Sequence, residues 1–455
     1  MPDADASEGD NEDERVDGNA EALHVFEEEE MVKGEMSPDW TPWSLHKHNH
    51  VLIKFAIMIL LMGLSFRLLF SHSGVFAPIS DSPSAADPSM ISSDYLAGLG
   101  FSRKREKCDL FVGEWIPNPS GPHYTNDSCT IVEPHQNCMK NGRPDTGYLY
   151  WKWKPRDCDL PMFNGKEFLE TMRNKAWALI GDSISRNHVQ SLICLLSKVE
   201  QAVEIYHDKE YRSKTWRFPS YEFTLSVIWS PFLVQADIFE DMNGVSSKDI
   251  QLHLDTLDNK WTRQFHKYDY IIIAGGKWFL KTAIYYEKRR IIGCHYCPGK
   301  NITEVGFEFA YKKALHLVLH HIIATKYKGV VFFRTSTPDH FENGEWWSGG
   351  TCNRTVPFRD GQMDLRDVDR VMRDIELEVF SEAVSFGSKK GIKMRLLDTT
   401  HISLMRPDGH PGPYRQFQPF AKNKTAEVQN DCLHWCLPGP IDSWSDVVME
   451  MLRRG

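Results

Sequence analysis

Ser183 is the first residue whose position suggests chemistry. It follows the short apolar segment Trp177–Ile180 and precedes an apolar-periodic segment, so it is expected at a turn from a strand into a helix. A helix N-terminus offers free backbone N–H groups and a positive potential, both useful to a nucleophile. The same position also suits a helix N-cap. Because Ser185 stands where the second glycine of a Gly-x-Ser-x-Gly elbow would be, the motif alone leaves both interpretations open.

A second set of residues, near the C-terminus, has the types that activate a serine. Asp431 and His434 are three residues apart and alternate with Cys432 and Cys436. A carboxylate at this spacing can bond to the histidine Nδ1 if both lie on one turn, which fixes the tautomer and leaves Nε2 free as a base. The alternative is a loop held by disulfides in which the histidine is merely exposed.

The elements from Phe163 onward must position these residues. Short apolar segments alternate with amphipathic ones, which is typical of an α/β fold with a parallel sheet covered by helices on both faces. In such folds ligands bind beyond the carboxyl ends of the strands. The expected strands are Trp177–Ile180, Tyr221–Trp229, Tyr270–Ala274, Gly329–Arg334 and Met394–Asp398. The expected helices are Ser185–Ser197, Glu308–Thr325, Leu365–Ser385 and Ser443–Leu452.

Two motifs in this order resemble one known family. The segment GDSISRN at Gly181–Asn187, together with DCLHWCLPG at Asp431–Gly439, is similar to the trichome-birefringence-like family of plant polysaccharide O-acetyltransferases, over about residues 105–455. The resemblance implies an α/β fold of the SGNH-hydrolase type. It also implies a triad in which Ser183 accepts the acetyl group, His434 is the base and Asp431 orients His434.

The oxyanion site is less complete than the triad. An oxyanion needs donors besides the backbone N–H of Ser183. The strand expected at Tyr270–Ala274 runs into Gly275 and Gly276, whose N–H groups are the natural candidates. Many members of the family carry an asparagine where this chain has Ala274, so a side-chain amide donor is absent. The alternative is that the glycines only form a tight turn.

The chain has ten cysteines, all after residue 107. Spacing alone does not choose among their pairings. The family resemblance implies the pairs Cys108–Cys158, Cys129–Cys194, Cys138–Cys436 and Cys352–Cys432. This leaves Cys294 and Cys297, a C-x-x-C that can begin a zinc site; because no second C-x-x-C exists, a local disulfide is the preferred interpretation and no metal is expected.

Polar and aromatic residues near the strand ends are candidates to contact a polysaccharide. Sugar-binding clefts commonly use tryptophan rings, and this chain has 14 tryptophans, although most tryptophans are core or rim residues. The segments around these residues most resemble the branch of the family that acts on hemicellulose, including xyloglucan and mannan. For each residue a structural role is the alternative. The candidates are Arg186, Asn187, Trp278, Trp346, Trp347, Arg406, Asp408 and His410.

The chain divides into five segments. Residues 1–50 form an acidic tail, expected to be disordered and cytosolic, and residues 51–70 are apolar and long enough to cross a bilayer. Residues 71–106 are rich in Ser, Pro and Ala and are expected to be a flexible stem. A cysteine-rich, loop-like subdomain at 107–162 precedes the catalytic domain at 163–455. We expect 51–70 to be an uncleaved signal anchor, the alternative being a buried helix.

The side of the membrane follows from features beyond the apolar segment. All ten cysteines and the four N-x-S/T sequons, at Asn126, Asn301, Asn353 and Asn423, lie after it, which favours an oxidising, glycosylating lumen. We therefore expect a single-pass type II protein of the secretory pathway, and the family resemblance implies the Golgi membrane. The net charge of −9 arises in the acidic tail, and because no long basic run follows, nucleic acid is not an expected partner.

The functional hypothesis is a polysaccharide O-acetyltransferase that acts through an acetyl-serine. Xyloglucan is the favoured acceptor and mannan the next. No bound cofactor is implied, because the acetyl donor, either acetyl-CoA or a relayed acetyl group, is a co-substrate, and proteins that supply acetyl groups are conceivable partners. The rival hypotheses are an acetylesterase with the same triad and a glycan-binding wall protein without turnover.

Overall fold

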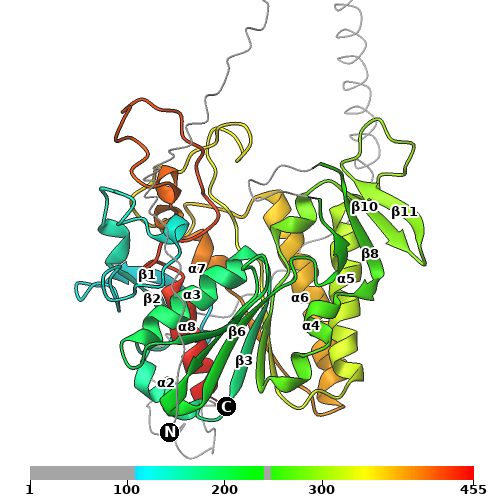
Figure 1. Ribbon diagram of the computed structural model, residues 1–455, viewed down its shortest axis with the longest axis horizontal. Coiled ribbons are helices and arrows are strands. Elements are labelled where there is room, and N and C mark those ends of the chain that lie inside the picture. The colour runs from blue at the N-terminus through cyan, green and yellow to red at the C-terminus, as the bar shows by residue number, and fades with distance from the viewer. Residues whose placement is uncertain (1–107, 240–246, 455) are drawn as a thin grey trace, which may run out of the picture. The chain divides into compact units, whose positions relative to one another are not determined.

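A seven-stranded sheet forms the centre of the computed structural model, which describes residues 108–239 and 247–454 (Figure 1). Its spatial order is β13-β12-β9-β3-β6-β5-β4, and the first five strands are parallel to one another. At the other edge, β5 pairs antiparallel with β6, and β4 pairs antiparallel with β5. The strands are β3 (Ala176–Gly181), β4 (Val203–His207), β5 (Lys214–Phe218), β6 (Phe223–Trp229), β9 (Tyr270–Ile273), β12 (Val330–Arg334) and β13 (Lys393–Leu397). The expected parallel sheet is therefore confirmed for its five central strands and corrected at one edge, where two antiparallel strands extend it.

The parallel strands form because their residues are apolar on both faces. In β3, five of the six residues are buried, and β9 consists of Tyr270 and three isoleucines, of which the isoleucines are buried. Continuous apolar runs of this kind suit strands covered by helices on both sides.

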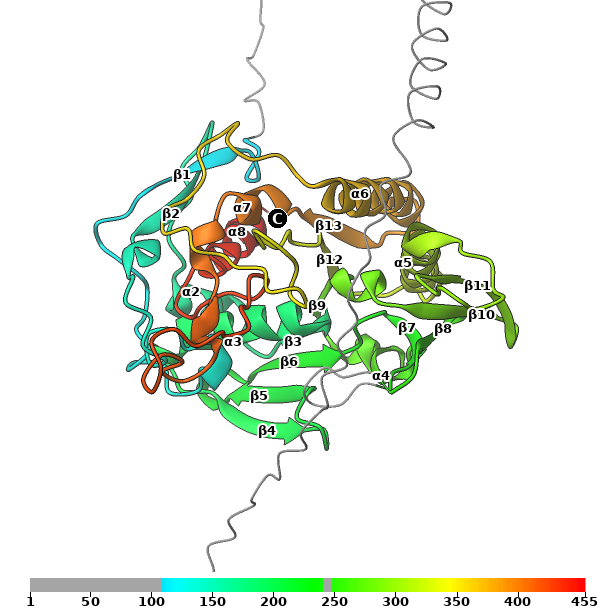
Figure 2. The same cartoon turned by 90° about the horizontal axis from the view of Figure 1, so that it is seen from above.

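Helices cover the two faces of the sheet separately (Figures 1 and 2). One apolar core contains residues of α2, α3 and α8, and a second contains residues of α4, α5 and α6. The helices are α2 (Gly165–Thr171), α3 (Ser183–Ser197), α4 (Asn259–Thr262), α5 (Gly306–Ala324), α6 (Asp367–Ser388), α7 (Thr400–Leu404) and α8 (Asp442–Arg453). The four expected helices correspond to α3, α5, α6 and α8.

Two smaller sheets flank this core. A hairpin-like pair belongs to the cysteine-rich N-terminal region, and a four-stranded sheet of order β11-β10-β8-β7 lies beside α5. Their strands are β1 (Gly113–Pro117), β2 (Trp151–Pro155), β7 (Val234–Asp237), β8 (Ile250–Leu257), β10 (Ala283–Glu287) and β11 (Arg290–His295).

Five disulfides cross-link the chain, and no cysteine of the part that the structure describes is free. They are the four pairs implied by the resemblance and the local C-x-x-C pair: Cys108–Cys158, Cys129–Cys194, Cys138–Cys436, Cys352–Cys432 and Cys294–Cys297. Two of them, through Cys432 and Cys436, flank His434, so this segment is tied to two distant regions.

The tail, the apolar segment 51–70 and the stem lie outside the described residues. Between residues 108 and 454, excluding 240–246, no helix is both long and apolar enough to cross a bilayer. Of the four sequon asparagines, Asn301, Asn353 and Asn423 are exposed and Asn126 is partly exposed.

Candidate active site

In the turn after β3, one residue caps the helix and the next is the candidate nucleophile. Asp182 is the N-cap of α3, and its Oδ1 accepts a hydrogen bond from the backbone N–H of Ile184 at 3.0 Å. Ser183 is the first helical residue and is partly exposed. The capping role that the sequence allowed for Ser183 is thus taken by Asp182, and the Ser183 hydroxyl is not engaged as a cap.

Asp182 also contacts the loop that follows β9. A Cβ atom added at Gly276 would lie 2.4 Å from Asp182 Oδ2, and one added at Gly275 would lie 2.7 Å from the ring of Tyr311. Only glycine therefore fits at either position without displacement. Burial raises the pKa of the Asp182 carboxyl, and the positive charge of Arg334 opposes that rise.

The candidate oxyanion donors lie at this junction. Strands β3 and β9 are adjacent and parallel, and they lie at the point where the strand order reverses, which is where ligands bind in folds of this type. The backbone N–H groups of Ser183, Gly275 and Gly276 donate no hydrogen bond to any residue of 108–239 or 247–454. Three donors thus remain available at the carboxyl ends of two neighbouring strands.

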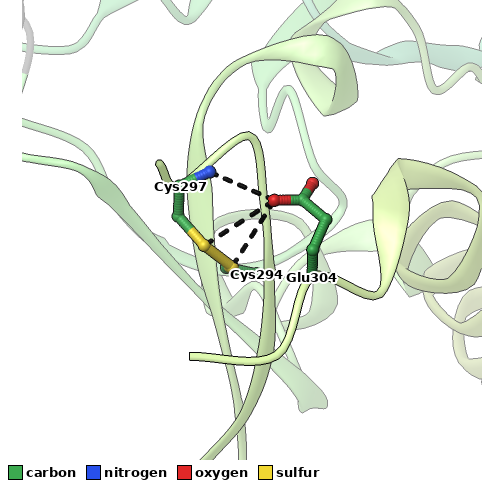
Figure 3. Close-up of side chains that lie close together, drawn as sticks. All are labelled: Cys294, Cys297 and Glu304. Atoms are coloured by element: carbon green, nitrogen blue, oxygen red, sulfur yellow. Dashed lines mark hydrogen bonds between the residues drawn. A yellow bond between two sulfur atoms is a disulfide. The ribbon is translucent and has the colours of Figure 1, made fainter. Parts of the chain in front are cut away.

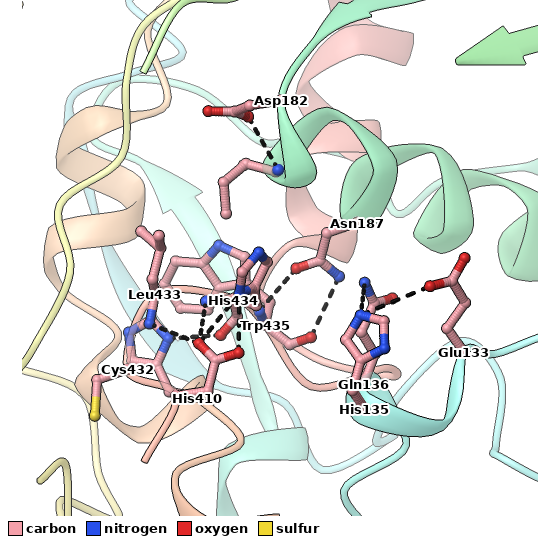
Figure 4. Close-up of polar contacts among 12 residues, drawn as sticks. Glu133, His135, Gln136, Asp182, Asn187, His410, Cys432, Leu433, His434 and Trp435 are labelled. Carbon is pink, nitrogen blue, oxygen red and sulfur yellow. Dashed lines mark hydrogen bonds and ion pairs between the residues drawn. The ribbon is translucent and has the colours of Figure 1, made fainter. Parts of the chain in front are cut away.

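Asp431 and His434 form the hydrogen-bonded pair that their spacing predicts (Figure 4). The Nδ1 of His434 lies 2.9 Å from Asp431 Oδ2 and 3.2 Å from Oδ1. Oδ1 also accepts the backbone N–H groups of Leu433 and His434. Although burial acts to raise the pKa of Asp431, the adjacent His434 and these hydrogen bonds hold it well below its usual range. An ionised Asp431 requires the proton of His434 on Nδ1, which leaves Nε2 free.

A chain of hydrogen bonds holds the segment that carries this pair. The Nδ1 of His410 donates to the backbone oxygen of His434 at 2.7 Å, and His410 Nε2 lies 2.7 Å from His340 Nδ1. The backbone N–H of His340 donates to the oxygen of Cys432, and Gly412 and Asp431 exchange two backbone hydrogen bonds. The segment is therefore fixed on both sides of His434.

Asn187 connects this segment to α3. Its Oδ1 accepts the backbone N–H of Trp435 at 2.7 Å, and its Nδ2 donates to the backbone oxygen of Trp435 at 3.2 Å. Asn187 lies one helical turn after Ser183, and Trp435 directly follows His434. Figure 4 shows His434 and Asn187 on the same side of the N-terminal turn of α3.

His135, from the cysteine-rich region, borders the site. Its ring packs edge to face against that of His434, with the centroids 6.5 Å apart. Burial lowers the pKa of His135 to about 4. Nothing in the sequence pattern singled out His135, because it lies in the short 3-10 helix Pro134–Gln136, far from both motifs in sequence.

Apart from Arg186, which is partly exposed, the glycan-contact candidates fall into two groups. Asn187, Arg406, Asp408 and His410 are buried, at 0 to 3% exposure. The guanidinium of Arg406 pairs with Asp408 at 2.7 Å and donates to the backbone oxygen of Tyr148. These side chains bond to one another or to the backbone of neighbouring loops, and their contact with a glycan stays a prediction.

The tryptophan candidates are better placed to meet a ligand. Trp346 and Trp347 are 45% and 69% exposed, and their rings stack edge to face. Their loop is tied to the Asp431–His434 segment by the Cys352–Cys432 disulfide and by a hydrogen bond from Gln429 to the backbone oxygen of Trp346. Trp278 is half-buried beside Trp229, a residue that the sequence analysis did not identify.

Cys294 and Cys297 form a disulfide rather than a metal site (Figure 3). The carboxylate of Glu304 lies against them and accepts the backbone N–H groups of Tyr296 and Cys297. Because both sulfurs are used in the disulfide, neither is a thiolate ligand. Among the described residues, no other cluster of histidine, cysteine or acidic side chains has metal-binding spacing.

Comparison with known proteins places these features in context. Residues 160–451 match the model of the PC-Esterase family, a GDSL/SGNH-like acyl-esterase family found in Pmr5 and Cas1p, and residues 106–159 match the PMR5 N-terminal domain. The chain is 52% identical to protein trichome birefringence-like 25 of Arabidopsis thaliana, over 93% of this chain and 97% of that protein. It is 42% identical to xyloglucan O-acetyltransferase 1 of Populus trichocarpa, over 80% of this chain and 85% of that protein.

Proposed function

Because the chain belongs to the GDSL/SGNH-like acyl-esterase family found in Pmr5 and Cas1p, we propose that it transfers acetyl groups to hydroxyls of a plant cell-wall hemicellulose through an acetyl ester of Ser183. The observation that carries the proposal is the Asp431–His434 pair, which Asn187 joins to the helix that begins at Ser183. Two relatives named as xyloglucan O-acetyltransferases make xyloglucan the favoured acceptor, with mannan next.

In the first step, Nε2 of His434 takes the proton of Ser183 Oγ as that oxygen attacks the acetyl carbonyl carbon of the donor. The resulting oxyanion accepts hydrogen bonds from the backbone N–H groups of Ser183, Gly275 and Gly276, which have no other acceptor among the described residues. The donor's leaving group then departs with the proton held by His434. The product is acetyl-Ser183 and neutral His434.

In the second step, His434 takes the proton of an acceptor sugar hydroxyl, whose oxygen attacks the acetyl-serine carbonyl. Collapse of the new oxyanion breaks the bond to Ser183 Oγ, which regains its proton from His434. Asp431 stays ionised and stabilises the imidazolium in both steps. The chemistry requires no metal or organic cofactor; acetyl-CoA or a relayed acetyl group serves as co-substrate.

The exposed rings of Trp346 and Trp347 supply the second part of the proposal. They lie on a loop cross-linked to the base-bearing segment, and flat exposed indoles suit the apolar faces of pyranose rings. The proposed location is the Golgi membrane, anchored through residues 51–70 with the catalytic domain in the lumen, where Asn126, Asn301, Asn353 and Asn423 are acceptors for glycans.

An acetyl-transfer assay with and without acceptor tests the function. The luminal domain is incubated with an acetyl donor alone, and then with xyloglucan or mannan oligosaccharides. We expect acetylated oligosaccharide to form and release of free acetate to fall when the acceptor is added. If acetate is released at the same rate with and without acceptor, the protein is an esterase. Absence of any turnover would favour a glycan-binding protein.

A further inference from the structure

Two arginine side chains share one tryptophan beside Ser183. Trp229 is the last residue of β6, is 4% exposed, and pairs in register with Gly181, two residues before Ser183. The guanidinium carbon of Arg186 lies 5.1 Å from the centroid of the Trp229 ring, and that of Arg212 lies 5.3 Å from it. Arg186 comes from the first turn of α3 and Arg212 from the connection between β4 and β5, so separate elements bring the two charges together.

Neither guanidinium has a carboxylate partner in the part of the chain that the structure describes. Within residues 108–239 and 247–454, neither guanidinium forms an ion pair within 4 Å or donates a hydrogen bond, and Arg186 Nε is buried without an acceptor. By contrast, the exposed Arg217 of β5 is paired with Glu222.

Two of the carboxylates that act on the charge of Arg186 are engaged elsewhere. Asp208 accepts the backbone N–H groups of Arg212 and Ser213 within its own turn. Glu133 accepts from the side chain of Gln190 and faces Lys214 and His135. Burial lowers the pKa of Arg186, Glu133 opposes this, and the like charge of Arg212 adds to it. Both guanidinium groups therefore keep unused N–H donors at the Trp229 ring, close enough for the charge of one to act on the other.

Arg186 follows Ser183 by three residues, so both side chains lie on one face of α3. A guanidinium binds carboxylate and phosphate oxygens through paired N–H groups. We propose that Arg186 and Arg212 form an oxyanion-binding subsite that holds a phosphate or carboxylate group of a substrate while Ser183 reacts. The proposal rests on the proposed role of Ser183. The group comes either from the acetyl donor, as a phosphate, or from an acidic sugar unit of the acceptor, as a carboxylate.

Direct binding measurements distinguish these sources without turnover. Calorimetric titration of the luminal domain with inorganic pyrophosphate, and separately with methyl glucuronide, measures affinity for each oxyanion. We expect one of them to bind, with an affinity that falls as the salt concentration rises. The same affinity should fall at least about tenfold in Arg186→Gln and in Arg212→Gln. Arg217→Gln is the matched control and should bind as the wild type does. Binding of pyrophosphate assigns the subsite to the donor, and binding of the glucuronide assigns it to the acceptor.

A kinetic comparison guards against a merely structural role. For a donor subsite, Arg186→Gln should lower kcat/KM for acetyl-CoA at least tenfold more than for 4-nitrophenyl acetate, which carries no phosphate. For an acceptor subsite, the same excess should appear for glucuronate-bearing over neutral oligosaccharides. The proposal would be overturned if Arg186→Gln lowered kcat/KM equally for both substrates of each comparison. It would also be overturned if the wild type bound neither oxyanion. Failure of Ser183 to become acetylated by 4-nitrophenyl acetate would instead refute the proposed function while leaving oxyanion binding measurable.

Discussion

Asn187 binds both backbone groups of Trp435, with hydrogen bonds of 2.7 and 3.2 Å, and thereby joins the helix that begins at Ser183 to the residue after His434. The two motifs are about 250 residues apart in sequence. This side chain, completely buried, is the shortest connection between them through hydrogen bonds of the described residues.

Asn187→Ala should therefore disturb the alignment of His434 with Ser183 without weakening substrate binding. Loss of two hydrogen bonds in a buried setting predicts a free energy of unfolding lower by about 2 to 3 kcal/mol. Misplacement of His434 relative to Ser183 predicts a kcat lower by about 10- to 100-fold with little change in KM. Urea unfolding and steady-state acetyl transfer measure the two effects. Gln201→Ala, whose side chain bonds only to the end of α3, is the control and should change neither; an Asn187→Ala enzyme with wild-type kcat would refute the alignment role.

Asp431→Asn tests the orientation of the base. The amide keeps one oxygen, but Asp431 accepts Nδ1–H of His434 and two backbone N–H groups with its two oxygens. The variant also lacks the charge that stabilises the imidazolium, so kcat should fall by about 10³- to 10⁴-fold while the protein stays folded. Circular dichroism and single-turnover rates check this, and a loss of less than tenfold would exclude Asp431 from the triad.

Gly276→Ala tests the junction between the two strand ends. Its Cβ would lie 2.4 Å from Asp182 Oδ2, so either the cap of α3 or the loop after β9 must shift. Because a shift of the oxyanion donors costs transition-state stabilisation, we expect kcat to fall by at least about 100-fold. A crystal structure of the variant should show the displaced element, and full activity with both elements in place would contradict the assignment of this loop.

The disulfides on either side of His434 should contribute more to the free energy of unfolding than the C-x-x-C disulfide does. Cys138–Cys436 links residues 298 apart, whereas Cys294–Cys297 links residues 3 apart. Chain entropy predicts losses of about 6 and about 2 kcal/mol in the free energy of unfolding when the respective pairs are replaced by serine. Thermal unfolding of the double variants Cys138→Ser/Cys436→Ser and Cys294→Ser/Cys297→Ser compares them. Equal destabilisation would mean that the long cross-link does not restrain the unfolded chain.

His188 predicts a specific dependence of stability on pH. Burial, aided by the charge of Arg334, lowers the pKa of His188 to about 3. The unfolded chain protonates this histidine below about 6.5 while the folded protein does not, so stability is full above that pH and is lost as pH falls. Between pH 7 and pH 5 the contribution lost is about 2 kcal/mol.

Replacing His188 by Gln should therefore reduce the difference in unfolding free energy between pH 7 and pH 5 by about this amount, measured by urea unfolding at both values. The exposed His207→Gln provides the control, because it should leave the difference unchanged. An unaltered pH dependence in His188→Gln would show that His188 is protonated in the folded state.

The sequence predicted those helices and strands whose own residues carry the pattern that determines them. Strands such as β3 and β9 are continuous apolar runs, and α3 has apolar periodicity, so both were expected at nearly their observed bounds. By contrast, all five residues of β4 are exposed, and β8 alternates buried and partly exposed residues. Such strands exist because a neighbouring strand supplies their hydrogen bonds, which a linear pattern does not reveal.

The candidate site shows the same division. The spacing of Asp431 and His434 predicted their contact, since three residues suffice to close it. The cap at Asp182 was not predicted, because Asp182 and Ser183 are equally good cap residues by type. Arg406 and Asp408 resemble a polar ligand site in sequence, and their ion pair at 1% and 0% exposure could not be predicted from it. The cluster of Arg186, Arg212 and Trp229 required three separate elements to meet.

Mass spectrometry of the acetylated protein tests the central claim most directly. The purified protein is incubated with an acetyl donor without acceptor, quenched in acid and digested, and the peptide containing Ser183 is sequenced. The account predicts an acetyl group on Ser183 that disappears when hemicellulose oligosaccharide is added, that forms far more slowly in His434→Ala, and that is absent in Ser183→Ala. Acetylated oligosaccharide produced by Ser183→Ala at the wild-type rate would contradict it.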